Sequence, residues 1–182
     1  MILYTADLHF GHSEVINFDH RPFADRDEMD AVLIKLWNER VQSDDTVYIV
    51  GDVCFKSHHN PDWYLRQLKG HKILIVGNHD WPLLDSPKAC SYFEGIEKML
   101  EIKDGENKIV LCHYPLTEWN GYYYGAWHIY GHIHNSRKEA YEFMKTKERA
   151  LNAGCMINNY TPASFNELAR NNEIFKRADV NH

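Results

Sequence analysis

The chain has 182 residues and a formal net charge of −6 at pH 7, with 44% hydrophobic and 25% charged residues. This length fits one domain, residues 1–182, and the chain shows neither an apolar run long enough to span a bilayer nor a secretory signal, so we expect a soluble, cytoplasmic protein. The acidic balance and the lack of a dense Lys/Arg cluster argue against long nucleic acid and favour a small substrate, while the oligomeric state stays open.

The first half of the chain alternates between apolar strands and helices. A strand over residues 1–6 precedes a helix over about residues 25–41, in which apolar side chains recur at helical spacing and Asp25 with Glu28 resembles a capping box. A second strand covers residues 46–50. Asn60-Pro61 then begins a short helix that ends at Gly70, and residues 73–76 form a third buried strand.

The second half is richer in strands. Strands over residues 96–102 and 108–112 are joined by a turn at 104–107, and a short strand follows at 127–130. Further β segments are expected near residues 139–144 and 149–153, before a last helix over about 164–171. We find no internal repeat or linker, which agrees with a single domain of the α/β class.

Five of these segments share one pattern, in which an apolar strand ends and Asp, Asn or His follows at once. The residues concerned are Asp7 and His9, Asp52, Asn78 and His79, His113, and His132 and His134. A lone histidine at a strand end is more often a solvated residue than a ligand. Neighbouring strand ends converge in space, however, so the pattern predicts an oxygen and nitrogen cluster for hard or borderline divalent metals. No Cys-x-x-Cys pair competes with this cluster, because the four cysteines are widely spaced.

Strand geometry gives one further expectation about this cluster. Side chains two residues apart on an extended strand point the same way, so we expect Asp7 and His9 to reach the same side of the sheet. Gly77 follows the third strand and permits a sharp turn there.

The order of the motifs, Asp-x-His, Gly-Asp, Gly-Asn-His-Asp, His and Gly-His-x-His over residues 7–134, resembles the calcineurin-like metallophosphoesterase family. The resemblance implies a four-layer α-β-β-α sandwich of two mixed β-sheets flanked by helices. It also implies two metal positions, with His79 as a residue that binds no metal and faces the substrate. The implied ligands are Asp7, His9 and His134 for one metal and Asn78, His113 and His132 for the other, with Asp52 as the bridge.

These residues suit phosphoester hydrolysis. A bridging carboxylate can hold two cations about 3.5 to 4 Å apart, close enough to act on one phosphate and to supply hydroxide from a shared water. His79 would protonate the departing oxygen as the general acid. We therefore predict a dinuclear metal-dependent phosphoesterase for a phosphate mono- or diester of a small molecule or nucleotide. Mn, Fe, Zn and Ni all suit such ligands, so the metal is left open.

Substrate contacts are less sharply defined. His12, Arg21 and Asn78 are candidates, since guanidinium and imidazolium groups suit phosphoryl oxygens, although a pairing of Arg21 with a surface carboxylate explains it equally well. The segment between His113 and Gly131 is rich in Tyr and Trp. It would reward stacking on a nucleotide base, but aromatic packing within a long loop is the more common explanation.

The chain departs from the protein phosphatases of this superfamily. Those enzymes continue the second motif as Gly-Asp-x-x-Asp-Arg, whereas this chain has Gly-Asp-Val-Cys-Phe-Lys at residues 51–56. A protein phosphatase is therefore disfavoured, and the orienting partner of His79 is left open, with Asp80 as a guess. The alternatives are a metal-bearing binding or scaffold protein without catalysis, which the presence of His79 disfavours, and a nuclease for short oligonucleotides.

Overall fold

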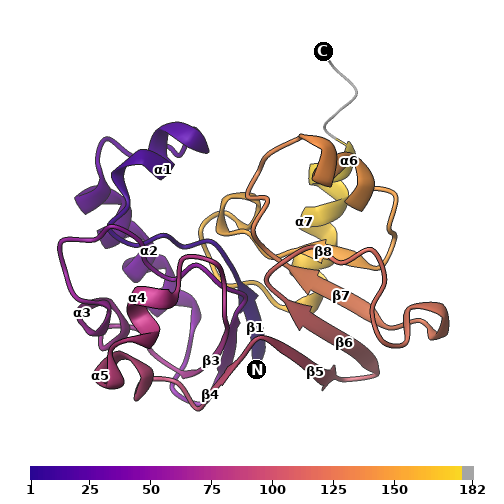
Figure 1. The fold of residues 1–182 in the computed structure, drawn as a ribbon, viewed down its shortest axis with the longest axis horizontal. Coiled ribbons are helices and arrows are strands. Elements are labelled where there is room, and N and C mark those ends of the chain that lie inside the picture. Colours follow the sequence, from indigo (N-terminus) through magenta and orange to yellow (C-terminus); the bar gives the residue numbers. More distant parts are fainter. Residues whose placement is uncertain (178–182) are drawn as a thin grey trace.

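Two four-stranded β-sheets lie face to face at the centre of the computed structural model, which describes residues 1–177 (Figure 1). The strand order is β1-β2-β3-β4 in the first sheet and β5-β6-β7-β8 in the second. The strands are β1 (Ile2–Thr5), β2 (Thr46–Ile49), β3 (His71–Ile75), β4 (Gly95–Glu97), β5 (Met99–Asp104), β6 (Asn107–Cys112), β7 (Trp127–Tyr130) and β8 (Ala150–Asn152).

The two sheets differ in strand direction. All neighbouring strands of the first sheet are parallel, which requires the helical crossovers that precede β2, β3 and β4. The second sheet is mixed, because β5 and β6 form an antiparallel hairpin while β6, β7 and β8 are parallel. The prediction of two sheets flanked by helices is confirmed, and the structure refines it in that only the second sheet is mixed.

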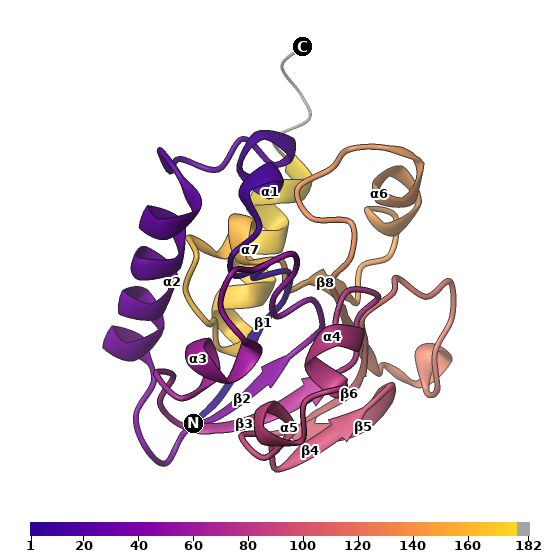
Figure 2. The same ribbon diagram turned by 60° about the vertical axis from the view of Figure 1, so that its left-hand side comes forward.

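Helices lie on both outer faces of the sheet pair (Figure 2), with α2 to α5 on the first sheet and α6 on the second, whereas α7 packs against the cluster between the sheets. The helices are α1 (Ser13–Phe18), α2 (Arg26–Arg40), α3 (Pro61–Leu65), α4 (Trp81–Leu84), α5 (Pro87–Cys90), α6 (Glu139–Met144) and α7 (Phe165–Arg177), with 3-10 turns η1 (Tyr122–Tyr124) and η2 (Cys155–Asn158). Half of the predicted capping box is present at α2, where Asp25 accepts a hydrogen bond from the amide of Glu28. The Glu28 carboxylate accepts from the amide of Ala24, one residue before the N-cap, rather than from that of Asp25. Among the described residues, no helix is long and apolar enough to cross a membrane.

Alternating side chains of the strands fill three apolar clusters, and these clusters separate four layers. In β3, Leu74 packs with α2 to α5 on one face of the first sheet, while Ile75 packs between the two sheets. In β7, Ile129 lies in the same central cluster, and Tyr130 packs with α6 on the outer face of the second sheet. The first layer is α2 to α5, followed by the first sheet and then the second sheet. The fourth layer is α6 together with the loop that carries Trp119 and Tyr122, as the predicted sandwich requires.

Two predicted elements are wrong in a way that matters for the topology. The single strand expected over residues 96–102 is two strands, β4 and β5, and the chain passes from the first sheet to the second at Lys98. The strand expected over residues 139–144 is the helix α6. Its Tyr141 and Met144 side chains are three residues apart, so they lie on the same face of the helix, and both are buried. The last helix also continues beyond residue 171, to Arg177.

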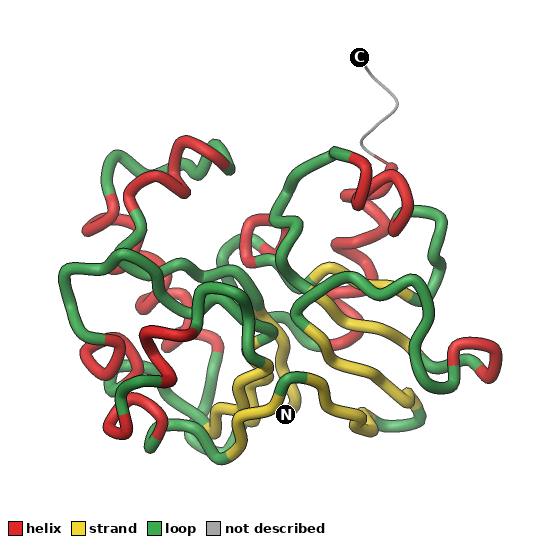
Figure 3. The backbone as a smooth tube through the Cα atoms, in the orientation of Figure 1, coloured by secondary structure: helices red, strands yellow, loops and turns green. Residues whose placement is uncertain are grey.

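The tube in Figure 3 shows how much of the chain is loop between short strands. Most strands have only three to five residues, so the loops after them begin close to the layer boundary between the sheets. These loops carry the predicted functional residues.

Candidate metal centre

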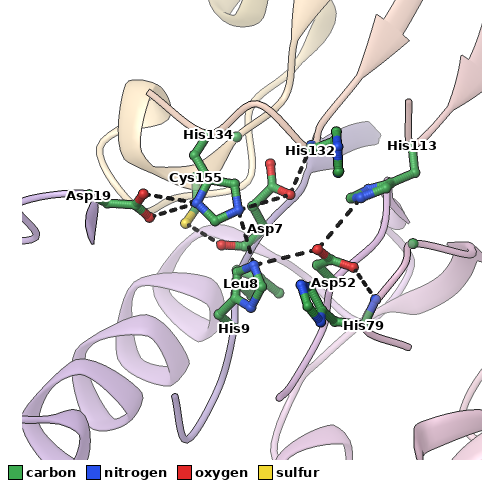
Figure 4. A network of polar contacts seen from close by, with 12 residues as sticks. Asp7, Leu8, His9, Asp19, Asp52, His79, His113, His132, His134 and Cys155 are labelled. Carbon is green, nitrogen blue, oxygen red and sulfur yellow. Dashed lines mark hydrogen bonds and ion pairs between the residues drawn. The ribbon is translucent and has the colours of Figure 1, made fainter. Parts of the chain in front are cut away.

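The loops that follow five strands meet at one place. β1, β2 and β3 are parallel neighbours in the first sheet, and β6 and β7 are parallel neighbours in the second, so their carboxyl ends lie side by side. Figure 4 shows the side chains from both sheets pointing toward one another. The residues brought together are those that the sequence predicts: Asp7, His9, Asp52, Asn78, His79, His113, His132 and His134.

The backbone at this site is unusual. Nine described non-glycine residues have a positive φ, and five of them are predicted ligands: Asp7 (55°), His9 (52°), Asp52 (58°), His132 (70°) and His134 (52°). Such conformations cost about 1 to 3 kcal/mol each and cluster at functional sites. Asp7 and His9 do reach the same group, as expected, but β1 ends at Thr5, so strand alternation is not the reason and both residues have left-handed backbone instead.

Asp80 and two glycines hold the loops together. The Asp80 carboxylate is fully buried and accepts hydrogen bonds from the amides of Asp52 (2.9 Å), Val53 (2.8 Å) and Gly77 (2.8 Å). A Cβ at Gly77 would collide with Asp52, and a Cβ at Gly51 would collide with the ring of His113. These close approaches require glycine. Both Asp80 oxygens thus accept from backbone amides, and Asp80 holds the turn that carries His79.

Four residues form the first group of possible ligands. One nitrogen or oxygen atom from each of Asp7, His9, Asp52 and His134 lies within 4.8 Å of the others. The Nε2 atoms of His9 and His134 face each other at 3.1 Å, and Asp52 Oδ2 lies 3.5 Å from His9 Nε2. Asp7 Oδ2 and His9 Nδ1 are buried without a hydrogen-bond partner among the described residues. Two carboxylates and two imidazoles that converge in this way fit a divalent cation.

The second group lies on the other side of Asp52. Asn78 Oδ1 is 2.9 Å from His113 Nε2 and 2.8 Å from His132 Nδ1. His113 Nε2 is also 3.5 Å from Asp52 Oδ2. The same carboxylate oxygen is therefore equidistant from a histidine nitrogen of each group, which is the place that a bridging ligand would occupy.

Hydrogen bonds behind two of the histidines fix their tautomers. His113 Nδ1 lies 2.8 Å from the carbonyl oxygen of Val50, to which it donates, and this leaves the lone pair on Nε2 facing the site. His134 Nδ1 donates in the same way to the carboxylate of Asp19, at 2.9 Å. Nothing in the sequence singled out Asp19, because it lies in a loop without a motif.

Burial disfavours charge on the side chains of this site. It is the main reason that the pKa of Asp52 is raised to about 7; His113 opposes the shift and Asp7 adds to it. Burial also lowers the pKa of His9 well below its usual value, with His134 as the next cause. The imidazole is thereby kept neutral, as metal ligation requires, and a bound cation would compensate the carboxylates.

His79 and His12 lie beside the ligand groups. The half-buried ring of His79 has its centroid 4.1 Å from that of Phe55 and 5.4 Å from that of His9. Burial is the first cause of its lowered pKa, followed by His113. His12 is 6% exposed, its ring centroid is 5.6 Å from that of His9, and its Nε2 pairs with Glu14 at 3.0 Å. Both rings are placed at the edge of the cluster.

Arg21 is not a phosphate contact. Its side chain is fully buried, and its guanidinium donates hydrogen bonds to the carbonyl oxygens of Asp7 and Leu8 and to the Asp19 carboxylate. Its partner is a buried carboxylate rather than a surface one. The Arg-Pro-Phe segment gave no sign of this, because burial of a loop arginine depends on the tertiary fold.

The aromatic segment mostly packs on itself. Trp119 is buried against Tyr122 and His128, and its Nε1 donates to the carbonyl oxygen of Ala126. This arrangement agrees with the packing explanation. Tyr114 is different, since its ring centroid lies 4.8 Å from that of His132 and the residue is exposed. It places an aromatic surface next to the candidate metal centre.

Comparison with known proteins gives relatives over almost the whole chain. The uncharacterised protein MJ1445 of Methanocaldococcus jannaschii is 30% identical over 171 residues, which cover 93% of this chain and 89% of that protein. Among solved structures, a protein of unknown function, AQ665 from Aquifex aeolicus, is similar with a TM-score of 0.73 and 25% identity over 93% of this chain and 98% of that one. No protein-family model matches the chain.

A looser structural likeness is to YfcE, a phosphoesterase from E. coli, with a TM-score of 0.41 and 13% identity over 84% of this chain and 77% of that one. This likeness is too weak to support a function. The residues carry the resemblance instead: five ordered motifs, at the ends of strands from two sheets, assemble one cluster of Asp, Asn and His side chains. The chain belongs to one family with MJ1445, and its motifs and two-sheet fold resemble those of the calcineurin-like metallophosphoesterases.

Proposed function

We propose that the protein is a dinuclear metal-dependent phosphoesterase, which hydrolyses a phosphate mono- or diester of a small molecule or nucleotide. The observation that carries the proposal is the position of Asp52 Oδ2, 3.5 Å from His9 Nε2 and 3.5 Å from His113 Nε2. A carboxylate oxygen between two groups of ligands suits two cations that share it.

The ligand roles follow from the two groups. Asp7, His9 and His134 would hold one divalent ion, and Asn78, His113 and His132 the other, with Asp52 between them. The nitrogen and oxygen donors suit Mn, Fe, Zn or Ni. When bound, two such ions lower the pKa of a shared water and stabilise charge on the phosphoryl oxygens. Asn78 is neutral, so it ligates without repelling an anionic substrate.

His79 would act as the general acid. Its amide donates a hydrogen bond of 2.9 Å to Asp52 Oδ1, which fixes the residue beside the proposed bridge. Its ring packs against Phe55 and lies outside the two ligand groups, so a ring nitrogen is free to hold a proton for the departing oxygen. His12 and Asn78 would contact the substrate phosphate. Tyr114 would offer a ring for stacking if the substrate carries a base.

The test is a panel of aryl phosphomonoesters, aryl phosphodiesters, cyclic nucleotides and short oligonucleotides, assayed with Mn²⁺, Zn²⁺, Ni²⁺ and Fe²⁺. We expect the wild type to release product with at least one ester class, and Asp52→Asn to lose turnover and to bind both ions more weakly. His71→Ala is the matched control, since His71 is exposed at the opposite, amino end of β3. It should retain wild-type turnover.

Three outcomes would overturn parts of the proposal. Near-normal turnover of Asp52→Asn with two bound ions would contradict the bridge. Hydrolysis of oligonucleotides alone would make the protein a nuclease. Two bound ions without turnover of any ester would support the metal-bearing binding protein instead.

A further inference from the structure

A buried ion pair stands directly behind the first group of ligands. Both carboxylate oxygens of Asp19 lie 2.9 Å from His134 Nδ1, and Asp19 Oδ2 also accepts hydrogen bonds from Arg21 Nε at 3.0 Å and Nη2 at 2.9 Å. Figure 4 shows Asp19 on the far side of the His134 ring from the cluster. Asp19 is 5% exposed, so the pair is enclosed by protein.

Arg21 connects this pair to the segment that carries Asp7 and His9. Its Nη2 donates to the carbonyl oxygen of Asp7 at 2.8 Å, and its Nη1 donates to that of Leu8 at 2.9 Å. One planar guanidinium therefore links the carboxylate behind His134 to the strained backbone at Asp7. Its Nη1 and Nη2 also lie 3.6 Å and 3.4 Å from the sulfur atoms of Met29 and Met156.

We propose that Asp19 and Arg21 are positioning residues. They hold the side chain of His134 and the backbone at Asp7 in the geometry of the first metal position before a cation binds. Acceptance of the Nδ1 proton by Asp19 leaves the His134 lone pair on Nε2, the atom that faces His9 Nε2 at 3.1 Å. Arg21 holds the Asp7 and Leu8 carbonyl groups at the same time. The proposal rests on the function proposed above and adds a structural reason for the geometry of one of its two metal positions.

The backbone of His134 is fixed independently. Asn152, at the end of β8, donates from Nδ2 to the carbonyl oxygen of His134 at 2.8 Å. The ring and the backbone of this residue are thus each tied to a different element, and a wrong tautomer or rotamer would break the contact with Asp19.

Among the described residues, no ion pair stands behind a ring of the second group of ligands, although the amide of His132 donates to the Asp7 carboxylate at 3.0 Å. His113 donates to the neutral carbonyl of Val50, and His132 is exposed. The second position is therefore less enclosed and less constrained than the first. We expect the two positions to differ in affinity, with the first the tighter one, and loss of Asp19 to act mainly on that site.

The experiment measures Mn²⁺ binding to the metal-free full-length chain by calorimetry, for the wild type, Asp19→Asn and Arg21→Lys. We expect the tighter of two sites to weaken about 10 to 100-fold in both variants, with a smaller change at the other site. Asp19→Glu, which keeps the charge, should recover part of the affinity. Asp45→Asn is the matched control, because Asp45 is also buried and binds an amide and the N-terminus far from the site.

Thermal unfolding of each metal-free variant separates positioning from folding. If Asp19→Asn and Asp45→Asn lose similar stability but only Asp19→Asn loses Mn²⁺ affinity, the positioning role is supported. Equal affinities of wild type and Asp19→Asn, or equal weakening of both sites, would overturn it. A wild type that binds two ions without hydrolysing any ester would refute the proposed function alone, whereas a wild type that binds no Mn²⁺ would refute both.

Discussion

Several candidate ligands are held in the left-handed backbone conformation, which non-glycine residues seldom adopt. Asp7, His9 and Asp52 have φ between 52° and 58°, and Asp and His enter this region more readily than β-branched residues do. The strain is supported by backbone hydrogen bonds from Asp7 and His9 to the loop after β2. Residue types that coordinate metals are therefore also the types that fit the backbone of this site.

His79→Ala tests the acid role at the residue scale. We expect the variant to keep both ions, because the ring lies outside the ligand groups, and to lose about 10² to 10⁴-fold in turnover. The loss should grow as the leaving group becomes a weaker acid, since such a group needs the proton more. The measurement is kcat for a series of aryl phosphodiesters, together with the metal content. A uniform loss across the series would argue against proton donation by His79.

The sequence predicted which residues reach the site but not what supports them. Asp, Asn and His after apolar strands are visible in the chain, because the chemistry of a metal requires those residue types. The predicted phosphate contact of Arg21 was wrong, and the contact of Asp19 with His134 was not predicted. The burial of a loop side chain depends on segments far away in the sequence. Asp80 is a similar case, since its three amide partners come from two loops.

At the scale of elements, the positions of strands in the sequence were easier to predict than the sheet to which each strand belongs. The β1, β2 and β7 segments lie within a residue or two of their expected bounds, because each is a short apolar run. The break at Lys98 was missed, since the apolar pattern continues through it while the chain changes sheet. α6 was mistaken for a strand because its Tyr and Phe residues favour strands, and packing of Tyr141 and Met144 decides the outcome.

The strand β7 carries a buried histidine whose protonation should govern acid stability. His128 Nδ1 donates to the carbonyl oxygen of Val110 at 3.0 Å, and its Nε2 accepts from the amide of Leu116 at 3.1 Å. Burial lowers its pKa to about 4, below the value of about 6.5 in an unfolded chain. The unfolded state therefore takes up the proton first, and stability falls as the pH drops from about 6.5 toward 4.

His128→Gln removes this titration while leaving an amide donor and acceptor at the position. We expect the wild type to lose about 2 kcal/mol more of its unfolding free energy than the variant between pH 7 and pH 5. Urea unfolding at both pH values gives the comparison. Parallel pH dependence of the two proteins would show that His128 is not the group responsible.

At the scale of the whole molecule, the site lies where the two sheets meet. The first sheet supplies the ligands after β1, β2 and β3, and the second supplies those after β6 and β7. A cation bound by both sets would connect the sheets beyond the apolar cluster between them. The alternation of strands and helices indicated this class of fold, whereas the parallel order of the first sheet became clear only from the pairing.

Metal binding should therefore stabilise the entire fold. A ligand that binds only the folded state at 100 times its Kd adds about 2.7 kcal/mol per site, so the Tm should rise with Mn²⁺ and fall with a chelator. Asp52→Asn should show a much smaller rise than the wild type, and His71→Ala an unchanged one. The measurement is thermal unfolding with EDTA and with excess Mn²⁺; an identical Tm in both conditions would contradict a metal shared by the two sheets.

The central claim is that two ions on either side of Asp52 act together on one phosphoester. The most direct measurement titrates the metal-free protein with Mn²⁺ and follows hydrolysis of an aryl phosphodiester or monoester at each equivalent. We predict little turnover after the first equivalent and a rise to the full rate as the second binds, with no turnover by Asp52→Asn at the same occupancy. Full activity with a single ion, or none with two, would contradict the dinuclear mechanism.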